Sequence, residues 1–96
     1  MAAKLSLEER RDLARAWIQL QRSPQGSDAR GALFWAHERL WELTKDDPNE
    51  AWQTILEIAT LDSSSWNLEN LGAGPLEDLL VDHGREFIRR VEASAD

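Results

Sequence analysis

The sequence predicts an all-α fold, a compact bundle of about five helices arranged as antiparallel hairpins like those of helical-repeat proteins. Apolar residues recur every three to four positions in successive segments, and these segments are bounded by capping residues, glycine or proline. No segment alternates apolar and polar residues in the manner of a half-buried strand. Because 96 residues are the length of one ordinary domain, we expect a single domain over residues 1–96.

The first helix is predicted at about residues 7–22. Ser6 and Glu9 have the spacing of a capping box, which marks a helix start. The apolar face that follows contains Leu13, Ala16, Trp17 and Leu20. The opposite strip contains Arg11, Arg15 and Arg22. We expect this strip to face solvent, the alternative being that it pairs with the acidic residues later in the chain.

The second helix is predicted to begin near Ala29, after a short loop of helix breakers and capping residues. A shared face is predicted for Leu33, Ala36, His37, Leu40 and Thr44. Phe34 and Trp41 lie on the flank of this face, whereas Trp35 points to the other side. A helix with large apolar groups on both sides is either wedged between neighbours or keeps one aromatic side chain for a partner.

The third helix has the clearest start in the sequence. Asp47 suits the N-cap position, and Pro48 suits the first helical position because its missing N–H has no partner to lose there. The helix is predicted over about residues 48–61. The residues predicted to be buried are Trp52, Ile55, Leu56 and Ala59.

A helical turn and two helices complete the predicted bundle. The turn, over about residues 66–71, stops at a Gly-Ala-Gly-Pro segment, and the next helix begins at Pro75. The inner face of that helix is predicted to contain Leu76, Leu79, Leu80 and His83. Gly84 suits the left-handed position that ends a helix, and a final helix is predicted to reach about Ala93. That final helix is defined by Phe87, Ile88 and Val91.

The negative charge is concentrated in the middle of the chain. The formal net charge is −7, from 11 basic and 18 acidic residues. Residues 41–84 contain ten acidic residues and Lys45 as their one base, whereas residues 1–40 carry a net charge of +2. A direct nucleic-acid ligand is not expected, because binding to phosphates requires a clustered basic surface. We expect instead a protein partner with a basic surface.

Cysteine and targeting segments are absent from the sequence. Without cysteine there are no disulfides, thiolate metal ligands or thiol nucleophiles. The first residues lack the apolar stretch of a secretory signal, and no run reaches the length of a membrane span. We therefore expect a cytoplasmic protein without a membrane partner, and we expect no cofactor.

The second half of the chain contains the run Ala-Gly-Pro-Leu-Glu-Asp-Leu-Leu at residues 73–80. Upstream of it are Phe-Trp at 34–35, Arg-Leu-Trp at 39–41 and Ala-Trp at 51–52. Together these segments resemble a family of short, uncharacterised bacterial proteins classed as a domain of unknown function, over most of positions 13–92. The resemblance implies an all-helical fold and brings no activity with it.

The residues that most resemble catalytic or ligand-binding motifs have structural interpretations. The His-Glu pair that begins at His37 starts like the zinc-protease motif His-Glu-x-x-His, but tryptophan stands where the second histidine belongs. His37 and His83 both lie on apolar faces, where we expect hydrogen-bonded core histidines. The segment Gly72-x-Gly74-Pro75 is expected to join two helices, because a phosphate loop follows a strand and needs backbone donors that proline lacks. No catalytic or metal-binding residue is predicted.

Acidic and aromatic side chains are therefore the candidate partner-binding residues. The acidic candidates are Glu57, Asp62, Glu69, Glu77, Asp78 and Asp82. The five tryptophans divide into two groups. Burial is predicted for Trp17, Trp41 and Trp52. Partner contact is predicted for Trp35 and Trp66, since such aromatic side chains carry much of the binding energy at interfaces, and the alternative for Trp35 is burial between the first and third helices.

These features favour a non-catalytic protein-binding module. Its expected role is that of an acidic inhibitor or immunity-type protein, comparable in size and charge to anti-CRISPR proteins, that covers a partner's basic surface. The first alternative is a structural or scaffold subunit that binds through exposed tryptophans. The second is a small hydrolase that uses His83 with Asp78 or Glu77; it ranks last, because a nucleophile, a cofactor loop and a metal set are missing.

Overall fold

The computed structural model describes residues 5–94, except for the side chains of residues 85–87, 90, 91 and 94. All regular secondary structure in this range is helical, which confirms the predicted fold class. The helices are α1 (Leu7–Arg22), α2 (Asp28–Asp46), α3 (Pro48–Leu61), α4 (Ser65–Ala73) and α5 (Pro75–Ser94).

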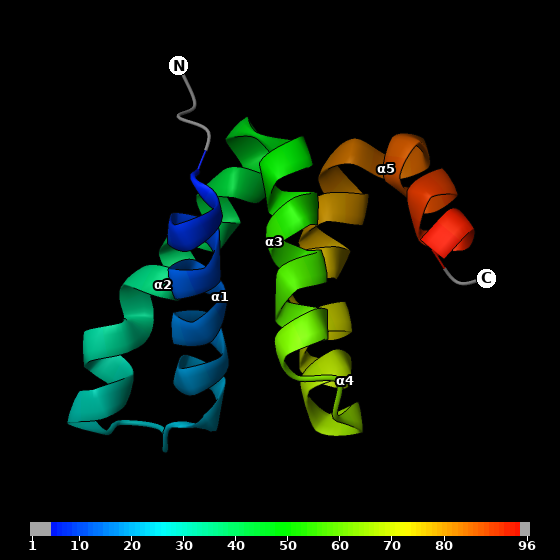
Figure 1. The fold of residues 1–96 in the computed structure, drawn as a ribbon. Coiled ribbons are helices and arrows are strands. Elements are labelled where there is room, and N and C mark those ends of the chain that lie inside the picture. The colour runs from blue at the N-terminus through cyan, green and yellow to red at the C-terminus, as the bar shows by residue number, and fades with distance from the viewer. Residues whose placement is uncertain (1–4, 95–96) are drawn as a thin grey trace.

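The helices pass up and down the molecule in Figure 1. There α1 descends, α2 rises, α3 descends, and α4 and the first part of α5 rise behind α3. α1 packs against α2 and α3, and α5 packs against the same two helices. The radius of gyration is 13.0 Å, so the chain is compact. Over the described residues, no helix has both the length and the apolar character needed to cross a membrane.

Side-chain caps define where the helices begin. Ser6 and Glu9 form the predicted capping box at the start of α1. The same capping role at α2, α3 and α4 belongs to Ser27, Asp47 and Ser64. Each of these side chains accepts a hydrogen bond from a backbone N–H of the first turn, which has no partner inside the helix. The predicted bounds of 7–22 and 48–61 coincide with α1 and α3.

The predicted helix end at Gly84 is a kink inside α5. Its φ of 36° and ψ of −114° are non-helical, and the helical path resumes beyond it. Glycine reaches this positive φ without the clash that a Cβ atom would cause. In Figure 1 the segment after the kink turns away from α3. Of the three residues predicted to define the last helix, Ile88 is exposed, and the side chains of Phe87 and Val91 lie outside the described part of the chain.

Side chains from all five helices form the hydrophobic core. Its members include Trp17, Leu20, Leu40, Leu43, Ile58, Leu71 and Leu79. The predicted burial of Trp17, Trp52 and Ile55 is confirmed. These large side chains provide most of the apolar area that folding removes from water.

Three predicted core residues lie on the surface. Trp41 is 48% exposed, Leu56 on α3 is 37% exposed, and His37 is exposed. The buried side of α2 is centred on Ala36, Leu40, Leu43 and Thr44. This side shares Ala36, Leu40 and Thr44 with the predicted stripe and differs from it in including Leu43 and leaving out His37.

The arginine strip of α1 pairs largely with α3, which corrects the expectation that it only faces solvent. Arg11 Nε lies 3.1 Å from Glu57 Oε1, and Arg22 forms a close ion pair with Asp62. Arg15 instead lies 4.0 Å from Asp12 of its own helix. The alternative of pairing with the acidic segment therefore holds for two of the three arginines, although all three side chains remain more than half exposed.

Candidate functional site

An open groove of about 300 Å³ lies between α2, the end of α1 and the junction of α4 with α5. Trp17, Leu20 and Leu40 are the buried core residues that reach it. Exposed aromatic side chains and one carboxylate form its walls. A concave site of this composition is the first place to look for a binding function.

The α2 wall is one face of that helix. Arg30, Phe34, His37 and Trp41 follow each other at intervals of four, three and four residues, so their side chains form one stripe. Phe34 and Trp41 are each 48% exposed. The rings of Phe34 and His37 are tilted against each other with centroids 5.3 Å apart. The stripe therefore presents aromatic surface to the groove.

The opposite wall is the junction between α4 and α5. Gly74 ends α4, and a Cβ atom at this position would lie 3.2 Å from the carbonyl oxygen of Asn70, so only glycine fits without adjustment. Pro75 begins α5 with its φ already helical. Asp78 follows in the first turn of α5 and faces the groove. The Ala-Gly-Pro-Leu-Glu-Asp run thus shapes one wall.

Arg30 closes the end of the groove nearest the α1–α2 loop. Its Nη1 donates hydrogen bonds to the carbonyl oxygens of Leu20, at 2.9 Å, and Ser23, at 3.2 Å. These carbonyls belong to the last turn and C-cap of α1, where a cation is favoured by the helix dipole. The charge of Arg30 is therefore used within the fold.

Lys45, Asp82 and Trp41 form a compact group above the groove. Lys45 Nζ lies 2.6 Å from Asp82 Oδ2 and 5.2 Å from the centroid of the Trp41 ring. The ammonium is thus held between a carboxylate of α5 and an aromatic ring of α2. Attraction to the ring's negative face adds to the ion pair.

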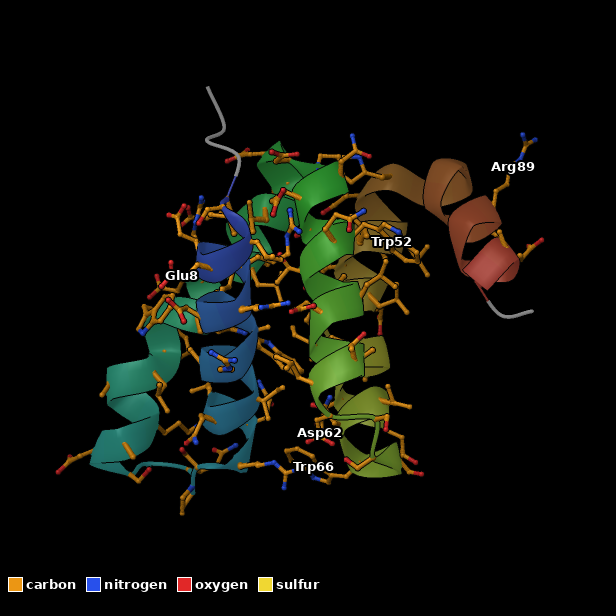
Figure 2. The ribbon with its side chains drawn as sticks, viewed as in Figure 1. Glu8, Trp52, Asp62, Trp66 and Arg89 are labelled. Carbon is orange, nitrogen blue, oxygen red and sulfur yellow. The ribbon has the colours of Figure 1, made fainter. Side chains whose placement is uncertain are left out.

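A second group of the same kind joins α1 to the α3–α4 loop. Arg22 pairs with Asp62, and its guanidinium carbon lies 4.8 Å from the centroid of the Trp66 ring. Figure 2 labels Asp62 and Trp66, which lie at the lower end of the molecule where α3 meets α4. The hydrogen bond from Arg22 and those from Ser64 lower the pKa of Asp62 from 3.8 to about 2.

This shift predicts a specific response to acid. A carboxylate whose pKa is lowered by folding stabilises the protein above its unfolded pKa, and this stabilisation is lost as the pH falls toward the folded value. As the pH falls from about 5 to about 2, a range that includes the unfolded and the folded pKa of Asp62, Asp62→Asn should therefore lose less thermal stability than the wild type. The measurement is the thermal midpoint at a series of pH values. Asp12→Asn is the matched control, and acid profiles of equal slope for wild type and Asp62→Asn would contradict the prediction.

The structure separates the predicted partner-binding residues into two sets. Three acidic candidates are engaged inside the fold: Glu57 with Arg11, Asp62 with Arg22, and Asp82 with Lys45. The other three are Glu69 on α4 with Glu77 and Asp78 on α5, and no ion pair involves them among the described residues. Trp35 is 49% exposed, which rules out its alternative burial between helices. Trp66 is 41% exposed but has Arg22 over its ring.

Sequence reasoning missed the groove residues Phe34, His37 and Trp41. Their spacing with Arg30 was the available signal, since it places them on one helix face. His83 has different surroundings from His37. Its Nε2 lies 2.7 Å from the carbonyl oxygen of Thr44 near the end of α2, and because a carbonyl only accepts, Nε2 is the donor. The hydrogen bond predicted for His83 is confirmed, but the side chain is half-buried and does not belong to the core as predicted. Within residues 5–94, no cluster of His, Cys, Asp and Glu that could hold a metal ion was found.

Comparison with protein families gives one match. Residues 23–96 match the family of unknown function DUF6869. The chain belongs to this family. The DUF6869 region contains α2 to α5, and therefore both walls of the groove, whereas Trp17 and Leu20 come from α1, outside the matched residues. No curated protein and no solved structure shows significant similarity to the chain.

Proposed function

We propose that this DUF6869 protein is a non-catalytic, acidic protein-binding module that covers a basic surface of another protein. The observation that supports it best is the set of carboxylates at Glu69, Glu77 and Asp78, which no described cation neutralises. We call this set the acidic junction, because it lies on α4 and at the start of α5. An inhibitor or immunity-type protein of the bacterial or phage cytoplasm, similar in action to anti-CRISPR proteins, fits this description.

Internal pairing narrows the surface available to a partner. Residues 41–84 hold ten acidic residues, but four of these pair with cations of α1 and α2: Glu50, Glu57, Asp62 and Asp82. The acidic junction keeps its negative field for solvent and partners. Such a field steers encounter with a basic surface and makes association sensitive to salt.

A structural or scaffold subunit is the second candidate. The exposed side chains of Phe34 and Trp41 on one side of α2, and of Trp35 on another, favour it, since exposed aromatic side chains are typical of protein interfaces. Binding in this case would be driven by burial of these apolar side chains against the partner. It would therefore depend little on salt, in contrast to binding through the acidic junction.

The test neutralises the acidic junction. The variant Glu69→Gln/Glu77→Gln/Asp78→Asn is immobilised beside the wild type at low salt, exposed to a lysate of the native host, and eluted with a salt gradient. We expect the wild type to retain a basic protein, and the variant to bind that purified protein about tenfold more weakly, because the complementary charges are gone.

The control variant Glu38→Gln/Asp46→Asn/Glu92→Gln makes the same change in net charge at exposed positions outside the junction. It should retain the partner nearly as well as the wild type. Equal losses in both variants would mean that net charge alone drives capture. The scaffold function would be favoured instead if the captured protein stays bound at high salt and if the protein self-associates in a way that Trp35→Ala abolishes.

A further inference from the structure

The fold uses one arrangement twice, in which a cation lies between a carboxylate and a tryptophan ring. Arg22 lies between Asp62 and Trp66, and Lys45 lies between Asp82 and Trp41. In the first group the three side chains come from α1, the α3–α4 loop and α4, whereas in the second Lys45 and Trp41 both belong to α2 and Asp82 to α5. The arrangement combines an ion pair with attraction to the aromatic face, and both contributions act on the same cation.

The groove contains a further carboxylate, Asp78, together with the Trp41 ring that already lies near Lys45. Lys45 on α2 contacts Asp82 on α5, and Figure 1 shows that α2 and the first part of α5 rise in the same direction. One helical turn earlier on each helix lie Trp41 and Asp78, on the same faces. Both of these residues line the groove. The helix register therefore faces Asp78 toward Trp41 as it faces Asp82 toward Lys45.

No cation of the described residues pairs with Asp78, although Lys45 lies near the Trp41 ring. Arg30 also lines the groove, but its guanidinium is bound to carbonyl oxygens at the end of α1. It lies eleven residues before Trp41 on the same helix, which is about 16 Å along the axis. The part of the groove next to Asp78 is thus complementary to a positive charge.

We propose that the groove binds an arginine side chain of the partner protein, with the guanidinium between Asp78 and Trp41. This inference rests on the proposed function and names the contact that the partner makes. Arginine fits better than lysine because its planar guanidinium stacks on aromatic rings and pairs with a carboxylate through two hydrogen bonds. The rings of Phe34 and His37 lie further along the stripe, where they contact the aliphatic part of the side chain.

The experiment uses arginine without the partner. Nα-acetyl-arginine amide is titrated into the ¹⁵N-labelled protein, and the indole N–H signal of Trp41, assigned with Trp41→Phe, is followed by NMR. We expect saturable binding with a dissociation constant on the order of 1–10 mM. Nα-acetyl-citrulline amide has the same shape without the charge and should bind at least about fivefold more weakly.

Two substitutions with the same charge change test the role of Asp78. Asp78→Asn should weaken arginine binding about tenfold, whereas Glu38→Gln, at an exposed position of α2 outside the groove lining, should stay within about twofold of the wild type. The full set of backbone amide signals checks that both variants are folded. If Asp78→Asn does not fold, Trp41→Leu replaces it, and it should also lose arginine binding.

The outcomes separate this inference from the proposed function. Equal binding of arginine and citrulline, or equal effects of Asp78→Asn and Glu38→Gln, would overturn the arginine site even if the acidic junction still captured a basic protein. Arginine binding at Trp41 that depends on Asp78 supports the site. If no basic protein is captured at the same time, the proposed function fails while the site stands.

Discussion

Arg10→Ala is expected to lower the free energy of unfolding by about 3 kcal/mol, because it leaves a buried carboxylate without its partner. Arg10 Nε lies 2.8 Å from Glu50 Oε1, and Nη2 lies 3.1 Å from Glu50 Oε2, so the pair is bidentate. The Glu50 side chain is only 4% exposed. The hydrogen bonds with Glu50 raise the pKa of Arg10, which favours its charged form. Urea denaturation at pH 7 measures the loss.

A control and a double variant identify the cause of this loss. Arg15→Ala removes an exposed ion pair on the same helix, in which Arg15 Nη1 lies 4.0 Å from Asp12 Oδ1. It should lower the free energy of unfolding by less than about 0.5 kcal/mol. Arg10→Met/Glu50→Leu removes both charges and keeps the volume, so it should lose clearly less than Arg10→Ala. If the double variant loses as much, the effect comes from packing of the arginine stem and not from the stranded charge.

Asn67→Asp is expected to cost about 3 kcal/mol at pH 7, although the two side chains have the same shape. Asn67 is fully buried in α4, and its Nδ2 donates to the carbonyl oxygens of Asp62, at 2.6 Å, and Ile58, at 3.5 Å. Aspartate would place a negative oxygen against these two acceptors. In the wild type, Asn67 Oδ1 is buried without a hydrogen-bond partner. The second carboxylate oxygen of the aspartate would occupy this position and would also lack a donor.

The pH dependence of this variant has a defined sign. Burial without a donor raises the pKa of the new carboxyl above its value in the unfolded chain. The variant is therefore less destabilised at a pH below the unfolded pKa, and it loses stability as the pH rises above it. Chemical denaturation of wild type and variant at pH 4 and pH 7 measures the difference. Asn70→Asp, one turn later on α4 and at the surface, is the control and should cost about 1 kcal/mol or less. Losses that do not change with pH would contradict the explanation.

Helix boundaries are predictable from this sequence because the signals are local. The capping box at Ser6 and the Asp47-Pro48 start satisfy backbone groups within a few residues, and no distant contact changes that requirement. The kink at Gly84 is predictable for the same reason, since only glycine reaches its φ easily. Tertiary packing then decides whether the chain stops at such a residue or continues as a helix.

The candidate site is less predictable because it depends on which helix covers which face. Periodicity placed His37 and Trp41 in or beside the core, and it could not show that this side of α2 borders an open groove. The same limit applies to charge. The acidic residues of the middle segment look equivalent in sequence, but the packing of α1 against α3 gives Glu57 and Asp62 arginine partners and leaves Asp78 without one. Buried polar residues such as Glu50 and Asn67 likewise gain their meaning from partners far along the chain.

The position of α1 has a consequence for which part of the chain buries the core. The residues that match DUF6869 start at residue 23, after α1 ends, yet α1 supplies Trp17 and four other buried side chains and packs against α2 and α3. The stretch shared with the family is therefore smaller than the unit that buries this core. A homologue that retained the shared stretch alone would expose an apolar face about one helix wide, and it would need a replacement helix from elsewhere in its own chain or from a neighbouring subunit. In this chain α1 is therefore as much a part of the fold as the helices that match the family.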